Sequence, residues 1–142
     1  MTTHTTQKKR VAIVHDFLLY PGGAERVLDA LIALYPDAPV YTLLYDKEKM
    51  GASYKNIDVR TSFLQKLPRW LRRRHKWLLP LYASAVERFD LRDFDLIISS
   101  SGAWSKGLVT RLDTMHVAYI HSPMRYVWDE NEKYLAQATG KK

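Results

Sequence analysis

Runs of β-branched and aliphatic residues alternate along the chain with stretches whose apolar residues recur at helical spacing. The first run, Val11 to Val14, is wholly apolar, which is typical of a strand buried on both faces of a sheet. A helix is predicted at 24–35, ended by Pro36, with a stripe of Val27, Leu28, Leu31, Ile32, Leu34 and Tyr35. Further strands are expected at 40–45, 57–60, 94–99 and 117–120. This alternation predicts an α/β fold, a parallel sheet in the order 3-2-1-4-5 with flanking helices.

Two helical segments are predicted between the third and fourth strands, at residues 62–67 and 69–89. Pro80 is expected to kink or restart the second segment, because its ring nitrogen has no hydrogen to donate to the preceding turn. One stripe of that segment is apolar and is expected to face the core: Leu71, Leu78, Tyr82, Ala85, Val86 and Phe89. A last segment, 129–138, has helical propensity but too few apolar residues to hold it in place by itself.

The length and composition of the chain predict one packed domain. It has 142 residues, 46% of them hydrophobic and 12% aromatic, more than a disordered chain carries. We divide it into a flexible tail (1–9), an α/β domain (10–128) and a terminal helix (129–142) that is expected to be truncated and frayed. Exposed apolar surface is expected at the unfinished edge of the sheet or in the cleft. The absence of cysteine excludes disulfides, thiolate metal sites and a cysteine nucleophile.

The net charge of +7 is concentrated in one stretch. Residues 66–76, here called the basic segment, contain six cations and no acid: Lys66, Arg69, Arg72, Arg73, Arg74 and Lys76. Together with Trp70 and Trp77 they have three interpretations. The first is an amphipathic helix that lies on an anionic membrane surface, and the second is a site for nucleic-acid phosphates. The third is a solvated helix face whose tryptophans belong to the core. No signature of a nucleic-acid-binding fold accompanies them.

Any contact with a membrane is expected to be peripheral. The first ten residues are polar and lack the apolar stretch of an export signal. The longest nearly apolar stretch, Trp77 to Val86, is about half as long as a membrane-spanning helix.

The turn after the first strand contains Gly22 and Gly23. Residues without Cβ let backbone N–H groups approach a ligand, and a helix N-terminus favours anions, so a diphosphate suits this turn. The alternative is a tight strand-to-helix turn that needs glycine for its geometry. The chain has neither G-x-G-x-x-G nor Gly-Lys-Ser/Thr, which argues against a dinucleotide fingerprint or a P-loop.

Polar residues follow the fourth and fifth strands, at the edge where open α/β sheets bind ligands. Ser100, Ser101 and Trp104 suit a sugar ring, with a helix cap and a core tryptophan as the alternative. His121 suits a sugar hydroxyl or a developing charge, with a structural role as the alternative. His116, five residues earlier, points to the opposite face of the strand, so the two histidines make a poor metal pair and no metal site is predicted.

Three motifs occur in a fixed order. The first runs from His15-Asp16 to Pro21-Gly22-Gly23-Ala24-Glu25-Arg26, the second joins Ala85-Val86-Glu87-Arg88-Phe89-Asp90 to Asp95-Leu96-Ile97-Ile98-Ser99-Ser100-Ser101, and the third is His121-Ser122-Pro123-Met124-Arg125-Tyr126-Val127-Trp128-Asp129. As a set, over about residues 10 to 135, they resemble the N-terminal domain of bacterial family-4 glycosyltransferases.

This resemblance implies half of a GT-B enzyme, in which two Rossmann-like domains face each other across a cleft. The N-terminal domain mainly holds the acceptor, and a C-terminal domain, missing from these residues, mainly holds the nucleotide-sugar. Such enzymes transfer the sugar with retention and without a metal, so no cofactor is expected beyond the nucleotide-sugar substrate. Their products are cell-surface polysaccharides or glycolipids. On its own the chain is expected to be an inactive fragment.

The resemblance places His121 beside the transferring sugar, and we predict it as the catalytic residue. Gly22 and Gly23 are predicted to bind the donor phosphate. The residues predicted to bind the acceptor are Asp16, Ser100, Ser101, Trp104 and Arg125; for Arg125, an ion pair with Asp129 is the alternative.

Lipid-linked acceptors bring this family to membranes, which favours the membrane interpretation of the basic segment together with Trp70 and Trp77. The expected location is the cytoplasm, peripheral on the inner face of the plasma membrane, with no nucleic-acid partner. A function of another class is also open. It is a non-enzymatic α/β module that binds a phosphate-bearing ligand or an anionic membrane through its glycine turn and basic segment.

Overall fold

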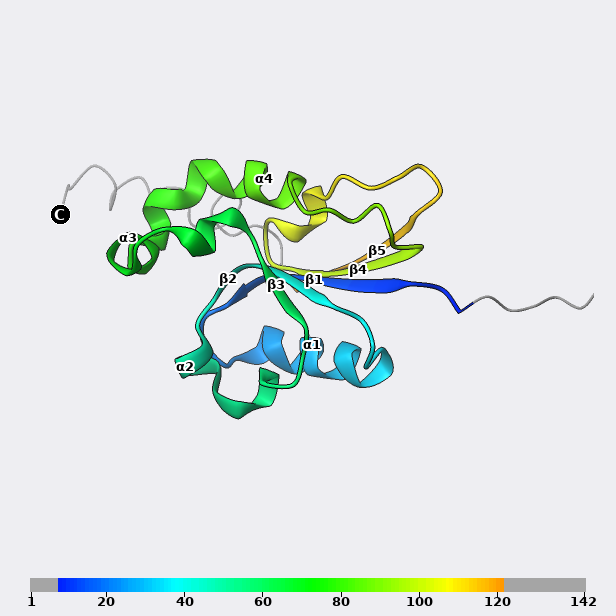
Figure 1. Cartoon of the computed structure of the whole chain (residues 1–142), viewed down its shortest axis with the longest axis horizontal. Helices are drawn as coiled ribbons and strands as arrows, with labels where there is room; N and C mark the ends of the chain where they lie inside the picture. Colours follow the sequence, from blue (N-terminus) through cyan, green and yellow to red (C-terminus); the bar gives the residue numbers. More distant parts are fainter. Residues whose placement is uncertain (1–7, 122–142) are drawn as a thin grey trace, which may run out of the picture.

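The structure, a computed structural model, describes residues 8–121, and in this part of the chain five parallel strands form one sheet in the order β3-β2-β1-β4-β5 (Figure 1). The strands are β1 (Val11–Leu18), β2 (Val40–Tyr45), β3 (Val59–Thr61), β4 (Leu96–Ser101) and β5 (Met115–Ile120). The fold is a Rossmann-like α/β fold, and the predicted strand order is confirmed.

β1 is longer than the apolar run that predicts it. It continues past Val14 through the polar pair His15 and Asp16 to Leu18. Pairing on both sides explains the extension, because β2 remains in register with β1 up to Leu18 and β4 up to His15. Two neighbouring strands thus hold polar residues in extended backbone, and these residues lie at the carboxyl edge of the sheet.

One face of the sheet is covered by α1 (Gly23–Leu34), with α2 (Lys47–Met50) and the 3-10 helix η1 (Gly51–Tyr54) at its end (Figure 1). Their core is built around Ile13, Leu28 and Val40, which are inaccessible to solvent. The stripe predicted for the first helix is wrong at Leu34, whose side chain is 71% exposed. Leu34 is the last residue of α1, beyond the part of the helix that packs on the sheet.

The other face is covered by four short helices instead of the two predicted segments. They are η2 (Phe63–Lys66), α3 (Arg69–Arg73), η3 (His75–Leu78) and α4 (Leu79–Glu87). The helical segment predicted over 69–89 therefore contains a break that was not predicted, and its last helix ends at Glu87. The backbone leaves the helical region at Arg74, where ψ is 47°. Pro80 lies in the first turn of α4, where a missing N–H costs no hydrogen bond, so the predicted restart is confirmed.

The apolar stripe predicted for this face is confirmed despite the break. Tyr82, Ala85 and Val86 are buried against Ala12 and Ile97 of the sheet. Leu71 and Leu78 belong to the same core, Leu71 at its edge. A last 3-10 helix, η4 (Ser105–Gly107), lies between β4 and β5.

The β5 edge of the sheet is exposed on both faces. Met115, Val117, Tyr119 and Ile120 are each about half exposed. This agrees with the expected apolar surface at the sheet edge. The predicted terminal helix, its fraying, Arg125 and Asp129 lie outside the described residues.

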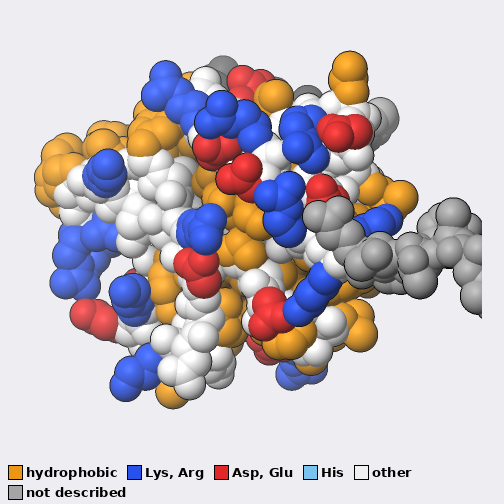
Figure 2. All heavy atoms as spheres, turned by 45° about the vertical axis from the view of Figure 1, so that its right-hand side comes forward, with side chains coloured by type: hydrophobic (Ala, Val, Ile, Leu, Met, Phe, Trp, Pro, Cys, Tyr) orange, Lys and Arg blue, Asp and Glu red, His pale blue; other side chains and the backbone are white. Residues whose placement is uncertain are grey.

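The end of the sheet where the strands begin carries mixed charges. Figure 2 turns this end forward and shows hydrophobic side chains between acidic and basic ones. A hollow of about 670 Å³ lies here, bounded by Leu34, Pro36 and Phe94. The ion pair of Lys8 with Asp37, 2.6 Å long, lies at its rim. Neither charge predominates at this end, and the predicted site residues lie at the opposite one.

Candidate functional site

Three parallel strands bring the predicted polar residues together at the carboxyl edge. In the register of the sheet, His15 lies opposite Ser100, and Ser100 lies opposite Tyr119. His121 follows β5 directly, and its backbone N–H donates to the carbonyl of Ser101 over 3.1 Å. Because side chains alternate along a strand, neighbouring residues serve opposite faces of the sheet. The site therefore has two parts, one on the α1 face and one on the α4 face.

On the α1 face, four side chains form a chain of contacts. The Oγ atom of Ser100 lies 3.1 Å from Nδ1 of His15 and 2.7 Å from Nε2 of His121. The other ring nitrogen of His15 lies 3.5 Å from Oε1 of Glu25, in the first turn of α1. His15 and Ser100 are almost fully buried, whereas His121 is half-buried. His121 is thus the outer end of an internal polar chain.

The chemistry of these groups fixes the direction of their hydrogen bonds. A carboxylate only accepts, so the hydrogen between Glu25 and His15 belongs to Nε2 of His15. With His15 neutral, its Nδ1 accepts from the hydroxyl of Ser100. The Ser100 oxygen then accepts from Nε2–H of His121. This leaves Nδ1 of neutral His121 as an acceptor, suited to a hydroxyl group.

The environment favours this neutral form of His121. Burial lowers the pKa of His121, and the neighbouring His15 lowers it further, against the opposing effects of Asp16 and Glu25. Burial would raise the pKa of Glu25, but its hydrogen bond with His15 and the charges of the two histidines outweigh this and lower that pKa. Near neutral pH the chain therefore has an ionised carboxylate at its inner end and a neutral imidazole at its outer end.

We expect the free energy of unfolding to decrease as the pH falls from about 7 to about 5.5. Burial also lowers the pKa of His116, so both histidines take up a proton at lower pH in the folded chain than the ordinary value of 6.5. In this window the unfolded chain binds more protons, and acid favours it. Urea unfolding across the range measures the effect, and His116→Gln should reduce the slope. Stability that rises on acidification would contradict the expectation.

On the α4 face, the buried carboxylate of Asp16 is surrounded by donors from residues 101–105. Four successive backbone N–H groups donate to it: Gly102 and Ala103 at 2.9 Å each, Trp104 at 3.3 Å and Ser105 at 2.7 Å. The hydroxyls of Ser101, at 3.1 Å, and of Ser105 donate to it as well. A carboxylate offers about four lone-pair sites, so these donors occupy both oxygens. Asp16 therefore orders the loop after β4.

This loop determines the position of three residues predicted to bind the acceptor. Asp16 and Ser101 bond to each other, and the ring of Trp104 packs against Tyr82 at 5.5 Å between ring centroids. Ser100 contacts His121 instead of presenting a free hydroxyl. Acceptor binding by these residues stays a prediction. In the structure they set the shape of the loop and the orientation of His121.

The turn at Gly22 and Gly23 does not depend on a backbone conformation reserved for glycine. Gly22 is extended, with φ at −161°, and Gly23 begins α1. A Cβ atom at Gly22 would lie 3.0 Å from Oε2 of Glu25, whereas one at Gly23 would meet nothing within 4 Å. The carboxylate of Glu25 therefore lies directly in front of Gly22. A donor phosphate at this turn, which stays a prediction, would approach a negative charge.

We expect Gly22→Ala to raise the pKa of Glu25 toward its ordinary value of 4.5, while the fold is retained. The new methyl group would push the flexible Glu25 side chain away from His15 and so remove the hydrogen bond that lowers this pKa. An NMR titration that follows the side-chain carboxyl carbon of Glu25 measures this pKa. Gly23→Ala is the matched control, expected to leave the value unchanged; an equal response in both variants would contradict the geometry.

Sequence reasoning missed two members of this site as site residues, His15 and Glu25. Both occur in the first motif, and their positions contained a usable signal. His15 is a polar residue in a buried strand, and Glu25 lies one turn into the following helix. Their contact depends on the angle between β1 and α1, which spacing alone does not give.

His116 lies apart from this site. Its Nε2 atom is 2.8 Å from the hydroxyl of Ser99, on the opposite face of β4 from Ser100. His116 and His121 thus point to different faces, as their spacing predicts. Residues 8–121 contain no group of three or more side chains placed to hold a metal ion.

The basic segment lies on the surface next to the carboxyl edge. Trp70 and Trp77 are 64% and 63% exposed, so neither is a core residue. The guanidinium of Arg74 lies 4.7 Å from the ring centroid of Trp77. Arg72 is half-buried and donates from Nε to the carbonyl of Leu67 over 3.0 Å, whereas the other five cations of the segment are exposed. This arrangement excludes the interpretation in which the tryptophans belong to the core.

Among the helices of the described part, none has the length and apolarity needed to cross a bilayer. Comparisons of the chain with protein-family models, with curated proteins and with solved structures find no match.

Proposed function

We propose that this chain is the acceptor-side domain of a retaining glycosyltransferase with a GT-B architecture. In this proposal it acts with a second domain to move a sugar from a nucleotide-sugar to a glycan or lipid-linked acceptor. The resemblance of the three motifs supports it, and so does the Rossmann-like sheet with its predicted strand order. The observation that carries it is the polar chain ending in His121 at the carboxyl edge.

His121 is the residue we propose to contact the transferring sugar. Its neutral ring offers Nδ1 as an acceptor for a sugar hydroxyl, and its orientation is fixed by Ser100. Orientation by a buried partner lowers the cost of arranging the group during the reaction. Ser100 and His15 act through His121 and are positioning residues. Glu25 supplies the fixed negative charge that favours a positive charge developing on the histidines.

The loop ordered by Asp16 forms a second wall of the proposed site. Trp104 lies in this loop, is partly exposed, and offers an aromatic ring of the kind that stacks on sugars. Because Asp16 holds the loop through four backbone N–H groups, the loop has its own internal support without any ligand. A wall supported in this way lowers the entropy cost of binding an acceptor.

The partners in this proposal are a nucleotide-sugar, a glycan or lipid-linked acceptor and a C-terminal Rossmann-like domain. Polysaccharide or glycolipid synthesis at the inner face of the plasma membrane suits the exposed Trp70 and Trp77, which flank Arg72 to Arg74. Aromatic side chains and cations of this kind bind anionic headgroups.

An NMR titration with methyl glycosides tests the proposal. A panel of glucoside, galactoside, mannoside and N-acetylglucosaminide should shift the signals of His121 and of the loop at 102–104. His121→Ala should remove the response. His116→Ala is the matched control, because His116 is also half-buried and bonded to a serine of β4, but on the other face. No response to any glycoside, or equal loss in both variants, would contradict the proposal.

A second function is favoured by the exposure of the basic segment. In it the chain is a non-enzymatic module that binds a phosphate-bearing ligand or an anionic membrane. This second function predicts that the chain binds anionic lipid and that no glycoside shifts the NMR signals of His121. The same titration therefore separates the two functions.

A further inference from the structure

A groove opens at the carboxyl ends of β1 and β2, between α2 and α3. Figure 1 shows these two helices at the same end of the sheet, one on each side of it. The groove has a volume of about 600 Å³, within the range of small-molecule sites. Its walls include Leu19 and Tyr20, which follow β1, and Gln65, whose amide holds the backbone of Tyr45 through two hydrogen bonds. The groove is therefore supported by the sheet itself.

The lining of this groove is strongly basic. Five cations line it, Lys47, Lys49, Arg69, Arg72 and Arg73, against two carboxylates, Asp46 and Glu48, which leaves a net charge of +3. Only three of these cations belong to the basic segment. The two lysines come from α2, 20 or more residues before Arg69 in the chain. The fold thus adds charge to the basic segment at one concave place, which the sequence pattern did not predict.

Part of this charge has no partner among the described residues. Arg69 pairs with Glu48 at 3.3 Å, and Lys49 contacts Asp46 at 3.8 Å and the hydroxyl of Tyr20 at 3.2 Å. Within residues 8–121, the side chains of Lys47 and Arg73 have no hydrogen-bond or ion-pair partner. These two cations line the groove and remain available to a ligand.

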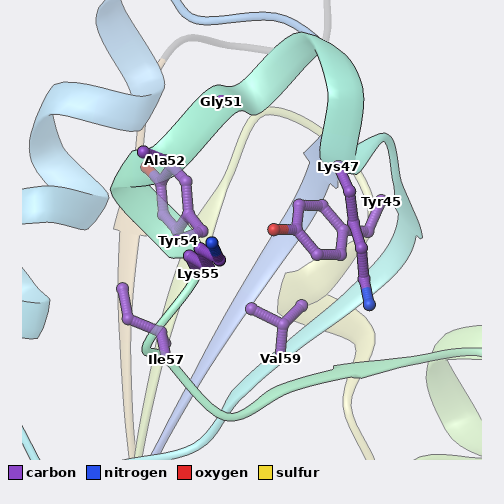
Figure 3. Close-up of a pocket in the computed structure, with 8 residues that line it drawn as sticks. All are labelled: Tyr45, Lys47, Gly51, Ala52, Tyr54, Lys55, Ile57 and Val59. Atoms are coloured by element: carbon purple, nitrogen blue, oxygen red, sulfur yellow. The ribbon is translucent and has the colours of Figure 1, made fainter.

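A second cavity, of about 450 Å³, adjoins the groove and shares Tyr45 and Lys47 with it. Figure 3 shows the hydroxyl of Tyr45 pointing into this pocket, with Lys47 beside its ring and Ile57 and Val59 at the opposite side. The hydroxyl of Tyr54 points away and donates to Asp29 over 2.7 Å. The pocket therefore offers the apolar side chains of Ile57 and Val59, two lysines, Lys47 and Lys55, and the hydroxyl of Tyr45 next to the basic groove.

We propose that the groove between α2 and α3 binds a phosphate or diphosphate group, held by Lys47, Arg69 and Arg73, and that the pocket at Tyr45 receives the group attached to it. This deepens the proposed function, on which it rests, by giving the acceptor a phosphate. Guanidinium groups bind phosphate oxygens in pairs, and an ammonium group adds a compact charge. The sheet edge is also where ligands of open α/β folds bind.

The groove suits a phosphate better than the glycine turn does. At that turn the carboxylate of Glu25 lies in front of Gly22, and a phosphate would be repelled. In the groove, cations outnumber carboxylates, and both carboxylates already have cationic neighbours. The groove and the glycine turn are neighbours, because Tyr20 lines the groove and lies two residues before Gly22. A phosphate in the groove would thus lie on the side of β1 away from His121.

Binding of inorganic pyrophosphate, measured by calorimetry and by NMR shifts, tests this site. We expect the double variant Lys47→Ala, Arg73→Ala to weaken binding by about tenfold or more, because two charge-assisted contacts are lost. The matched control is Lys66→Ala, Lys76→Ala, which removes the same charge from the basic segment outside the groove. It should change the affinity less than about twofold, since exposed charges at a distance are screened by salt.

The NMR signals of Tyr20, Tyr45 and Lys47 in the unmodified chain should shift when pyrophosphate binds. This readout does not depend on how the variants fold.

Vesicles of phosphatidylglycerol, with phosphatidylcholine as reference, identify the source of the phosphate. Competition with pyrophosphate supports a lipid headgroup in the groove, and its absence supports a soluble ligand there. No binding of pyrophosphate, or equal weakening in both double variants, would overturn the proposal. If no glycoside shifts the His121 signals of the unmodified chain while pyrophosphate still binds, the proposed function fails and this site stands.

Discussion

Asp16→Ala is expected to lower the free energy of unfolding by about 4 kcal/mol, the largest effect on stability that we predict from a single substitution. The change leaves four backbone N–H groups and two hydroxyls at residues 101–105 without their common acceptor. Ser105 is fully buried and Asp16 nearly so, and water replaces a lost partner poorly in such a place. Urea unfolding at neutral pH measures the change.

Asp46→Ala is the matched control. Asp46 also accepts from two backbone N–H groups, those of Glu48 and Lys49, but as the N-cap of the exposed helix α2. Loss of such a cap costs about 1 kcal/mol. If the two variants lost the same small stability, the carboxylate of Asp16 would not hold the loop, and its acceptor-binding role would gain support.

The sheet was predictable because its signal is local. Parallel strands buried on both faces are continuous apolar runs, and each run here is bounded by a turn or a helix, so the order followed from general rules of connection. β2 illustrates this: all of its residues are buried, and its predicted and observed bounds are the same, Val40 to Tyr45. The weakest expectation was the helical segment over 69–89, in which a kink or restart was expected at Pro80 but not the break at Arg74. The residues of this segment favour a helix. Leu71 and Leu78 nevertheless pack into the core from two separate helices, with the break at Arg74 between them.

The candidate site was predictable only in part. The carboxyl edge and the polar residues on it follow from strand direction, so Ser100 and His121 were identified together. Their contact with each other joins residues 21 apart in the chain, and the role of Asp16 depends on donors that are 85 to 89 residues away. The basic groove was missed for the same reason. Lys47 and Arg73 are separated in sequence and meet only because α2 and α3 flank the same strand ends.

The second large effect concerns His121. In a transferase that contains this domain and its nucleotide-sugar-binding domain, we expect His121→Ala to lower turnover about 100-fold with little loss of stability. The ring is half-buried and, within residues 8–121, makes one side-chain hydrogen bond, to Ser100, so its removal disturbs little packing. It removes the neutral acceptor at Nδ1 that the buried chain orients toward the reaction. Ser100→Ala should have a smaller effect on turnover, because it leaves the ring in place and loosens its orientation.

The rate of sugar transfer by this two-domain enzyme at saturating nucleotide-sugar, compared among the unmodified protein, His121→Ala and His116→Ala, tests the account most directly. We expect transfer by the unmodified protein, a loss of about 100-fold in His121→Ala, and nearly unchanged turnover in His116→Ala. Absence of transfer with every nucleotide-sugar, or unchanged rates in the His121 variant, would contradict the proposed role of this domain.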